Sequence, residues 1–140
     1  MTFHRILCPV DFSKASGAAL RTAATMARRS LTVLFVDDPL LVAAAAAAHD
    51  SRGSTRTAAI ELDRFIRRAL RTSPKPRGLR AIVAVGKPAD EILRLARRPR
   101  ADLIVMGTRG MGGVARLLLG STAEAVLRNA RIPVLAVPSP

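Results

Sequence analysis

Short apolar runs alternate with helix-forming segments along almost the whole chain. The apolar runs are Phe3–Val10, Leu31–Val36, Leu79–Val85, Asp102–Gly107 and Pro133–Val137. They are apolar throughout rather than at every second position, as is typical of strands that are buried on both faces of a sheet. Strands that alternate with helices predict an α/β fold, in which a parallel sheet is covered by helices on both faces.

The segments between these runs have mostly helical patterns. The predicted helices are Ser13–Arg29, Thr57–Arg71, Ala89–Arg97 and Leu117–Asn129. Asp11 and Ser13 are both candidate N-caps for the first of them. The segment Leu40–Arg56 holds six consecutive alanines but no large side chain to anchor a helix, so we expect a partly helical or mobile connection.

Length and composition bound the class of protein. The 140 residues have the length of one domain, residues 1–140, and a hydrophobic content of 49% argues against disorder. The single cysteine, Cys8, excludes an internal disulfide framework and a cysteine-rich zinc site, and its place in a strand favours packing over reactivity. We see no signal peptide, and Pro39–Ala48 is too short to span a bilayer, so we expect a cytoplasmic protein.

Positive charge is concentrated in the middle of the sequence. The net charge is +13, and residues 51–101 alone carry 14 cations and 4 anions. Such a region is either a face that binds polyanions or a solvated helix surface. Surfaces that bind single-stranded nucleic acid interleave aromatic and basic residues, and Phe65 is the only aromatic residue in this region. We favour the solvated surface, and nucleic-acid binding stays an alternative.

A glycine-rich segment follows the fourth apolar run. Five of the nine glycines fall between positions 107 and 120, in GTRGMGGVARLLLGST. In open parallel sheets, ligands bind outside the carboxyl ends of the strands, where glycine lets backbone N–H groups approach a phosphate. The P-loop pattern fails because Gly113 stands at its lysine position, and the pattern GxGxxG fails because Ala115 stands at its last glycine. Neither a P-loop nucleotidase nor a classical Rossmann dehydrogenase is supported.

The spacing Gly107-x2-Gly110-x9-Gly120-Ser121 resembles the nucleotide-binding signature of the universal stress protein family. The resemblance covers nearly the whole chain, through the segments ILCPVDFS, GKPADEIL, ADLIVMGTRGMGG, LLLGSTAEAVL and IPVLAV. It implies a Rossmann-like, adenine-nucleotide-binding fold with five parallel strands in the order 3-2-1-4-5. It also implies the ATP-binding branch of the family and a homodimer formed through Ile132–Val137, an apolar edge strand of the kind that invites pairing.

The same resemblance implies the residues of an ATP site. Asp11 and the backbone around Pro9 and Val10 would hold the adenosine, and main chain near Val36 would contact the adenine. Gly107 would lie against the ribose, and the glycine loop with the helix start would cradle the phosphates. The candidate residues are Pro9, Val10, Asp11, Val36, Met106, Gly107, Arg109, Gly110, Gly113, Gly120, Ser121 and Thr122.

Several of these residues also have a purely structural interpretation. Asp11 would serve as an N-cap, and Ser121 with Glu124 has the spacing of a capping box. Arg109 is either a phosphate partner or an ordinary exposed arginine. Phe35 stands where a histidine often precedes the valine in the family, which puts the adenine contact of Val36 in question.

The sequence shows little machinery for catalysis. There is no P-loop lysine, and Asp11 is the one candidate base or metal ligand in the predicted site. We therefore expect no catalytic residues, no metal site formed by the protein, and at most slow hydrolysis of ATP, alone or with Mg²⁺ or Mn²⁺. The favoured function is an adenine-nucleotide-binding, homodimeric module of stress-response signalling. The alternatives are a dimeric scaffold without nucleotide and a basic protein associated with nucleic acid; no membrane partner is expected.

Overall fold

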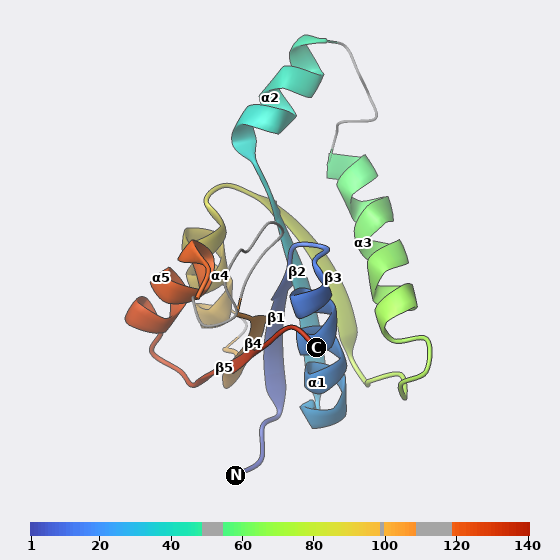
Figure 1. The fold of residues 1–140 in the computed structure, drawn as a ribbon, viewed down its shortest axis with the longest axis vertical. Coiled ribbons are helices and arrows are strands. Elements are labelled where there is room, and N and C mark those ends of the chain that lie inside the picture. The colour runs from blue at the N-terminus through green and yellow to red at the C-terminus, as the bar shows by residue number, and fades with distance from the viewer. Residues whose placement is uncertain (49–54, 99, 109–118) are drawn as a thin grey trace.

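The computed structural model describes residues 1–48, 55–98, 100–108 and 119–140, and in these ranges strands and helices alternate as the sequence predicts (Figure 1). The strands are β1 (Arg5–Val10), β2 (Ser30–Asp37), β3 (Leu79–Val85), β4 (Leu103–Gly107) and β5 (Val134–Val137). The helices are α1 (Lys14–Met26), α2 (Pro39–Ala47), α3 (Thr55–Ala69), α4 (Pro88–Arg97) and α5 (Ser121–Asn129). No described helix has the length and apolar character that a membrane span needs.

The five strands form one parallel sheet in the order β3-β2-β1-β4-β5, which confirms the predicted topology. β1 lies in the middle, between β2 and β4. β3 and β5 are the two edges, and β5 pairs with β4 from Ile104↔Val134 to Gly107↔Val137. The C-terminal apolar run is therefore an edge strand, as expected.

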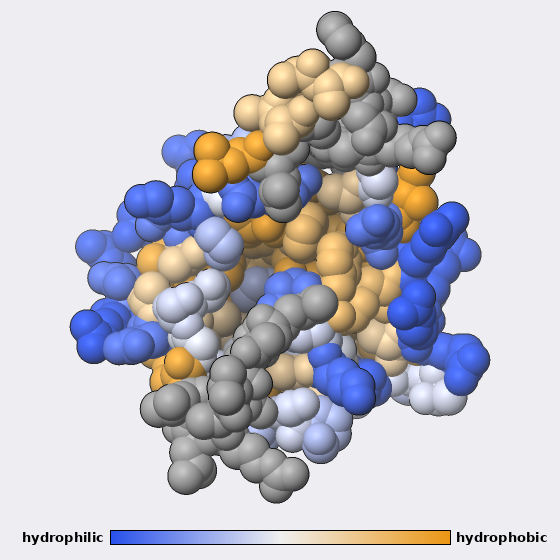
Figure 2. Space-filling view, turned by 45° about the horizontal axis from the view of Figure 1, so that its top comes forward, coloured by the Kyte–Doolittle hydropathy of each residue, from blue (hydrophilic) through white to orange (hydrophobic). Residues whose placement is uncertain are grey.

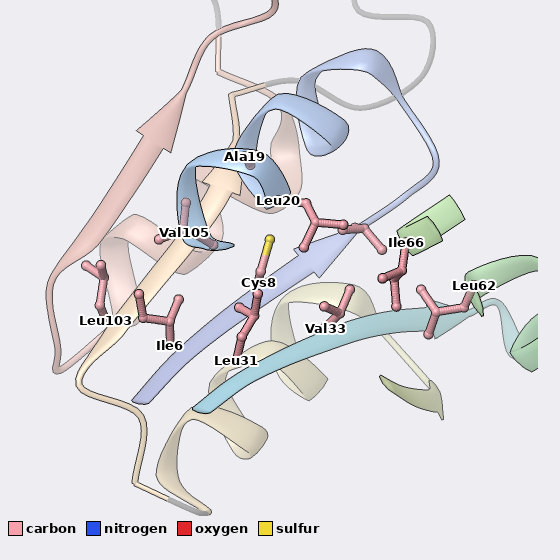
Figure 3. Close-up of a cluster of buried hydrophobic side chains, with 12 residues drawn as sticks. Ile6, Cys8, Ala19, Leu20, Leu31, Val33, Leu62, Ile66, Leu103 and Val105 are labelled. Atoms are coloured by element: carbon pink, nitrogen blue, oxygen red, sulfur yellow. The ribbon is translucent and has the colours of Figure 1, made fainter. Parts of the chain in front are cut away.

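Helices cover both faces of the sheet because the strands are apolar on both sides. Along β1, Ile6, Cys8 and Val10 pack with residues of α1 and α3, whereas Leu7 packs with residues of α4 and α5. Figure 3 shows the first of these two clusters, with the Cys8 thiol among aliphatic side chains. The two clusters are the core, and they fix the sheet between two helical layers.

The first helix begins later and ends earlier than predicted. Ser13 is its N-cap, and the Ser13 hydroxyl accepts a hydrogen bond from the Ser16 N–H at 3.1 Å. The helix ends at Met26 rather than Arg29, because Arg29 and Ser30 donate their N–H groups to the His4 carbonyl at 2.8 and 3.0 Å. These two bonds turn the chain into β2 beside the start of β1.

The alanine-rich segment is helical in its first part, as predicted. Asp38 caps α2 by accepting the Leu40 N–H at 2.8 Å, and Pro39 occupies the first helical turn. In Figure 1 this helix stands beyond the carboxyl end of β2, away from the sheet. Leu40 is 78% exposed, which fits a helix with no large side chain buried in the core.

Candidate functional site

The carboxyl ends of β1 and β4 meet at the point where the strand order reverses. After β1 the chain continues through α1 on one face of the sheet, and after β4 it continues through α5 on the other face. Ligands of open α/β sheets bind at such a switch point. Figure 2 looks obliquely onto this edge, where apolar side chains line a hollow and hydrophilic side chains gather on either side of it.

The fold brings together the predicted residues of three strand ends. Pro9 and Val10 end β1 and Asp11 follows them, Met106 and Gly107 end β4, and Val36 is the next-to-last residue of the neighbouring strand β2. Gly120, Ser121 and Thr122 lie at the start of α5. The remaining three predicted residues, Arg109, Gly110 and Gly113, lie outside the described residues.

Pro9 limits the hydrogen-bonded pairing between β1 and β4. The β1–β4 ladder contains the pairs Ile6↔Leu103 and Leu7↔Ile104, whereas the β1–β2 ladder continues to Val10↔Phe35. The Arg5 carbonyl accepts the Asp102 N–H at 2.8 Å, so odd-numbered residues of β1 face β4. Pro9 falls on this side and has no N–H to continue the ladder. The β1–β4 ladder therefore ends before the carboxyl end of β1.

Asp11 lies in the turn that joins β1 to α1. One carboxylate oxygen of Asp11 accepts the Ser13 N–H at 3.0 Å, and the Asp11 N–H donates to the Ser16 hydroxyl at 3.3 Å. Asp11 therefore stabilises the turn before α1 through these two hydrogen bonds, and Ser13 is the N-cap, which corrects the N-cap interpretation of Asp11. The carboxylate is half-buried, and its second oxygen makes no hydrogen bond within the described part of the chain.

Three of the predicted residues have buried side chains. Pro9, Val10 and Met106 are buried, with the side chain of Val10 in one core cluster and that of Met106 in the other. Val36 is half-buried and packs against the second cluster. The side chains of Pro9, Val10 and Met106 are therefore packed inside the protein, whereas that of Val36 is partly exposed.

Gly107 is required by packing. A Cβ at this position would lie 2.9 Å from the backbone carbonyl carbon and the Cβ of Ala15, and 3.0 Å from the Ser16 nitrogen. These atoms belong to the first turn of α1, and most of them are backbone that no side-chain rotation can move. The close approach of α1 to β4 therefore demands glycine, independently of the ribose contact that the resemblance implies.

The start of α5 differs from the sequence prediction. The helix begins at Ser121, and Leu119 and Gly120 are not helical, although a helix was predicted from Leu117. Gly120 is the N-cap and no side chain caps the helix, so the capping box of Ser121 and Glu124 is wrong. Glu124 instead accepts a 2.7 Å hydrogen bond from Arg128.

The exposed Ser121 hydroxyl is consequently not engaged in capping. The first helical bond recorded for α5 runs from the Glu124 N–H to the Gly120 carbonyl at 2.9 Å. The N–H groups of Ser121, Thr122 and Ala123 precede that bond and have no acceptor inside the helix. Together with the helix dipole they suit an anion.

Sequence reasoning missed the role of Thr108. Its N–H donates to the Val137 carbonyl at 3.0 Å, and its carbonyl accepts the Gly120 N–H at 2.7 Å. Thr108 therefore links the end of β4 to both β5 and the start of α5. The only sequence signal was its place directly after the strand, since both bonds use backbone atoms.

An aromatic cluster flanks the ends of β1 and β2. The rings of Phe12 and Phe35 stack with centroids 4.5 Å apart, and the Phe12 ring meets Phe65 edge-on at 5.4 Å. Phe12 has a φ of 66°, in the left-handed region that a bulky residue rarely adopts. Phe35 thus packs against Phe12.

Cys8 lies at the centre of the core and takes no part in the site. Its side chain is fully buried, and burial raises the pKa of the thiol above its ordinary value. This confirms the prediction of a packed cysteine. Within the described ranges, no three histidine, cysteine, aspartate or glutamate side chains are grouped to hold a metal ion.

Comparisons with known proteins agree with this fold. The chain is 56% identical over 55 residues to the universal stress protein MJ0531 of Methanocaldococcus jannaschii, a match that spans 39% of this chain and 32% of that protein's length. The structure resembles universal stress protein UspA from Lactobacillus plantarum with a TM-score of 0.76 and 28% identity, covering 98% of this chain and 99% of the other.

A second solved structure carries a nucleotide. The universal stress protein from Archaeoglobus fulgidus in complex with dAMP matches with a TM-score of 0.60 and 25% identity, covering 98% of this chain and 99% of that one. The model of the universal stress protein family matches residues 2–138. On this near-complete match and the shared topology, the chain belongs to the universal stress protein family.

Proposed function

We propose that the chain binds an adenine nucleotide, ATP foremost, at the switch point between β1 and β4, and that it acts as a binding module in stress-response signalling. The observation that carries the proposal is the start of α5, which has no side-chain cap and lies beside the end of β4. The dAMP complex of the Archaeoglobus fulgidus relative supports the same class of ligand.

The described residues suit such a nucleotide. The free N–H groups at the start of α5 and the Ser121 hydroxyl would face the phosphates, with Gly120 and Thr122 beside them. The backbone of Pro9 and Val10, the carboxylate of Asp11 and the backbone near Val36 would hold the nucleoside. Asp11 has an oxygen available because the Ser13 N–H occupies only one of the two.

The glycine loop completes the proposed site. Arg109, Gly110 and Gly113 would extend the phosphate contacts, as their positions in the family signature imply. The nucleotide would be bound alone or with Mg²⁺ or Mn²⁺. We expect at most slow hydrolysis, because Asp11 is the one carboxylate that we place at the bound nucleotide, and efficient phosphoryl transfer needs more positioned charge.

The decisive experiment tests directly whether the purified protein carries a bound nucleotide. Purified protein is denatured, and the supernatant is analysed for adenine nucleotides by ion-exchange chromatography. Refolded, nucleotide-free protein is then melted with ATP, ADP, AMP or cyclic AMP, each with and without Mg²⁺. Ligand at 100 times its Kd should stabilise the fold by about 2.7 kcal/mol. For 140 residues this corresponds to a rise in Tm of about 9 °C.

Matched variants locate the site. Gly120→Val should abolish the shift without unfolding the domain, because the φ of −64° at Gly120 suits any residue. Asp11→Asn should weaken it while keeping an oxygen for the Ser13 N–H. Gly17→Ala is the control and should keep the full shift, because a Cβ at Gly17 would face Arg21 and Phe65 rather than the proposed site residues. Protein that releases no nucleotide and shows no shift in millimolar ATP with Mg²⁺ would point instead to a scaffold without nucleotide.

We also propose a homodimer formed through β5. This strand is an edge of the sheet, so one side of its backbone has no strand partner in the described chain, and Leu135 is 37% exposed on it. Light scattering at micromolar concentration should give twice the chain mass. Leu135→Lys should shift the protein toward monomer, whereas Leu127→Lys, a similarly exposed leucine on α5, should not. A wild-type monomer would contradict the dimer.

A further inference from the structure

A second concave surface lies outside the proposed nucleotide site. It is a groove of about 650 Å³ between α1 and α3, and none of the twelve predicted site residues lines it. Lys14 and Arg21 are seven residues apart, so they lie two turns apart on one face of α1. Arg64 and Arg68 are four apart on the facing side of α3. Two basic stripes therefore border one groove.

None of the four cations forms an ion pair in the part of the chain that the structure describes. In the described ranges, ion pairs shorter than 4.0 Å are formed by Arg67, Arg94 and Arg128, and by none of the four groove residues. Glu61 is the one acidic side chain in the lining of the groove. The groove consequently presents a net positive charge that its own residues do not neutralise.

Aromatic rings lie among these charges. Phe12 and Phe65 both line the groove and meet edge-on at 5.4 Å. Gly17 of α1 has no side chain on this side of the groove. A Cβ at that position would lie 3.7 Å from both the Phe65 Cζ and the Arg21 Nη1. A ring edge and a guanidinium thus reach the same part of the groove. Both phenylalanines are half-buried, so part of each remains accessible.

From this combination we propose that the α1–α3 groove binds single-stranded nucleic acid. Cations that follow the backbone and aromatic rings on which bases stack are the two elements of sequence-tolerant recognition of single strands. The sequence suggested only Phe65 near the basic region, and the fold adds Phe12 from the end of β1. An acidic peptide would use the cations and leave the rings without a role. The inference goes beyond the proposed nucleotide site and does not depend on it.

The first test measures binding and its salt dependence. Fluorescein-labelled 12-mers of oligo(U) and oligo(dT) are titrated with the protein by fluorescence anisotropy between 50 and 200 mM salt. Four phosphate contacts on a single strand give a slope of about −2.8 in log Kobs against log salt, a fall of roughly 50-fold over this range. Binding of either oligomer supports the proposal, and the oligomer with the higher affinity shows whether the groove prefers RNA or DNA. No binding of either at 50 mM salt would overturn it.

The second test separates the groove from the overall basic charge. Arg21→Gln with Arg68→Gln should reduce the slope to about −1.4, because two contacts are removed. Arg97→Gln with Arg131→Gln changes the net charge equally, but these residues border a different groove, between α4 and α5. That control should keep the wild-type slope. Equal losses in both double variants would show non-specific attraction and contradict the proposal.

The third test addresses the rings. Phe65→Leu keeps an apolar side chain in the core but removes the stacking surface, so affinity should fall by about fivefold or more. A melting curve checks that the variant is folded, and Phe3→Leu, away from the groove, is the matched control. If polyglutamate competes as well as oligo(U) and Phe65→Leu binds normally, the groove takes acidic peptides and the proposal is wrong.

Discussion

The close approach of α1 to β4 predicts opposite effects for the same substitution at two glycines. Gly107→Ala would place a methyl group 2.9 Å from the backbone and Cβ of Ala15. Relief requires α1 to move away from β4 by several tenths of an ångström, and overpacking of this kind destabilises a fold by about 1–3 kcal/mol. The reduced entropy of the unfolded chain offsets about 0.4–1 kcal/mol of that. We expect a net loss of about 1–2 kcal/mol.

Gly17→Ala should instead stabilise the protein. A Cβ at Gly17 would lie 3.7 Å from its nearest neighbours, an ordinary contact, and the position is inside α1. Alanine is favoured over glycine inside a helix by about 0.5–1 kcal/mol.

Thermal and urea unfolding measure both effects. With an unfolding entropy of about 2.1 cal/mol/K per residue, a change of 1 kcal/mol shifts the Tm of 140 residues by about 3 °C. Gly107→Ala should therefore melt about 3–7 °C lower, and Gly17→Ala about 2–3 °C higher, with unchanged urea m-values. A Gly107→Ala variant that melts within 1 °C of the parent would refute the packing argument, and glycine at position 107 would then need another explanation.

Three further predictions follow from local geometry. Ser13→Ala should lower the free energy of unfolding by about 1 kcal/mol, because it removes the cap that binds the Ser16 N–H. Ser121→Ala removes no cap and should change it by less than about 0.5 kcal/mol in urea unfolding; equal losses would contradict the assignment of Gly120 as N-cap. Arg100 has a φ of 45°, so Arg100→Gly should relieve backbone strain and stabilise the protein by about 0.5–1 kcal/mol; a lower urea midpoint would contradict this. Burial raises the pKa of the Cys8 thiol, so an aromatic disulfide reagent at pH 8 should modify the thiol only in denaturant. Rapid modification of the native protein would contradict this prediction.

Much of the fold follows from the sequence because its signals are periodic and local. Strands that are apolar on both faces predicted the parallel sheet, and the predicted range of β3, Leu79–Val85, is the observed one. The order of the strands came from the resemblance to the family, because periodicity does not define which strands pair. The amphipathic pattern of α3 likewise places Leu62 and Ile66 on one apolar stripe, and both side chains lie in the core.

The errors lie where tertiary hydrogen bonds decide the local structure. Ser121 and Glu124 fit the pattern of a capping box, but the Thr108 carbonyl accepts the Gly120 N–H, and the helix starts one residue earlier than a Ser121 cap requires. α1 is shorter than its apolar pattern because the His4 carbonyl attracts two N–H groups of the following turn. None of these three bonds can be predicted from the sequence, since all of them join backbone atoms.

Contacts between residues far apart in the sequence could not be predicted either. The requirement for glycine at position 107 arises from α1, which lies some 90 residues earlier in the chain. The Phe12 ring joins Phe35 and Phe65 only when β1, β2 and α3 pack together. The basic charge of the middle region was predicted as a solvated surface, and the groove between α1 and α3 gives part of it a candidate ligand.

The central claim is that the switch point binds an adenine nucleotide, and isothermal titration tests it most directly. Nucleotide-free protein is titrated with ATP and Mg²⁺ at fixed ionic strength, beside Gly120→Val and the control Gly17→Ala. We predict saturable binding of one nucleotide per chain in the wild type and the control, and its loss in Gly120→Val with the fold intact. No binding heat at millimolar ATP at two temperatures, or equal binding by Gly120→Val, would contradict the proposed site.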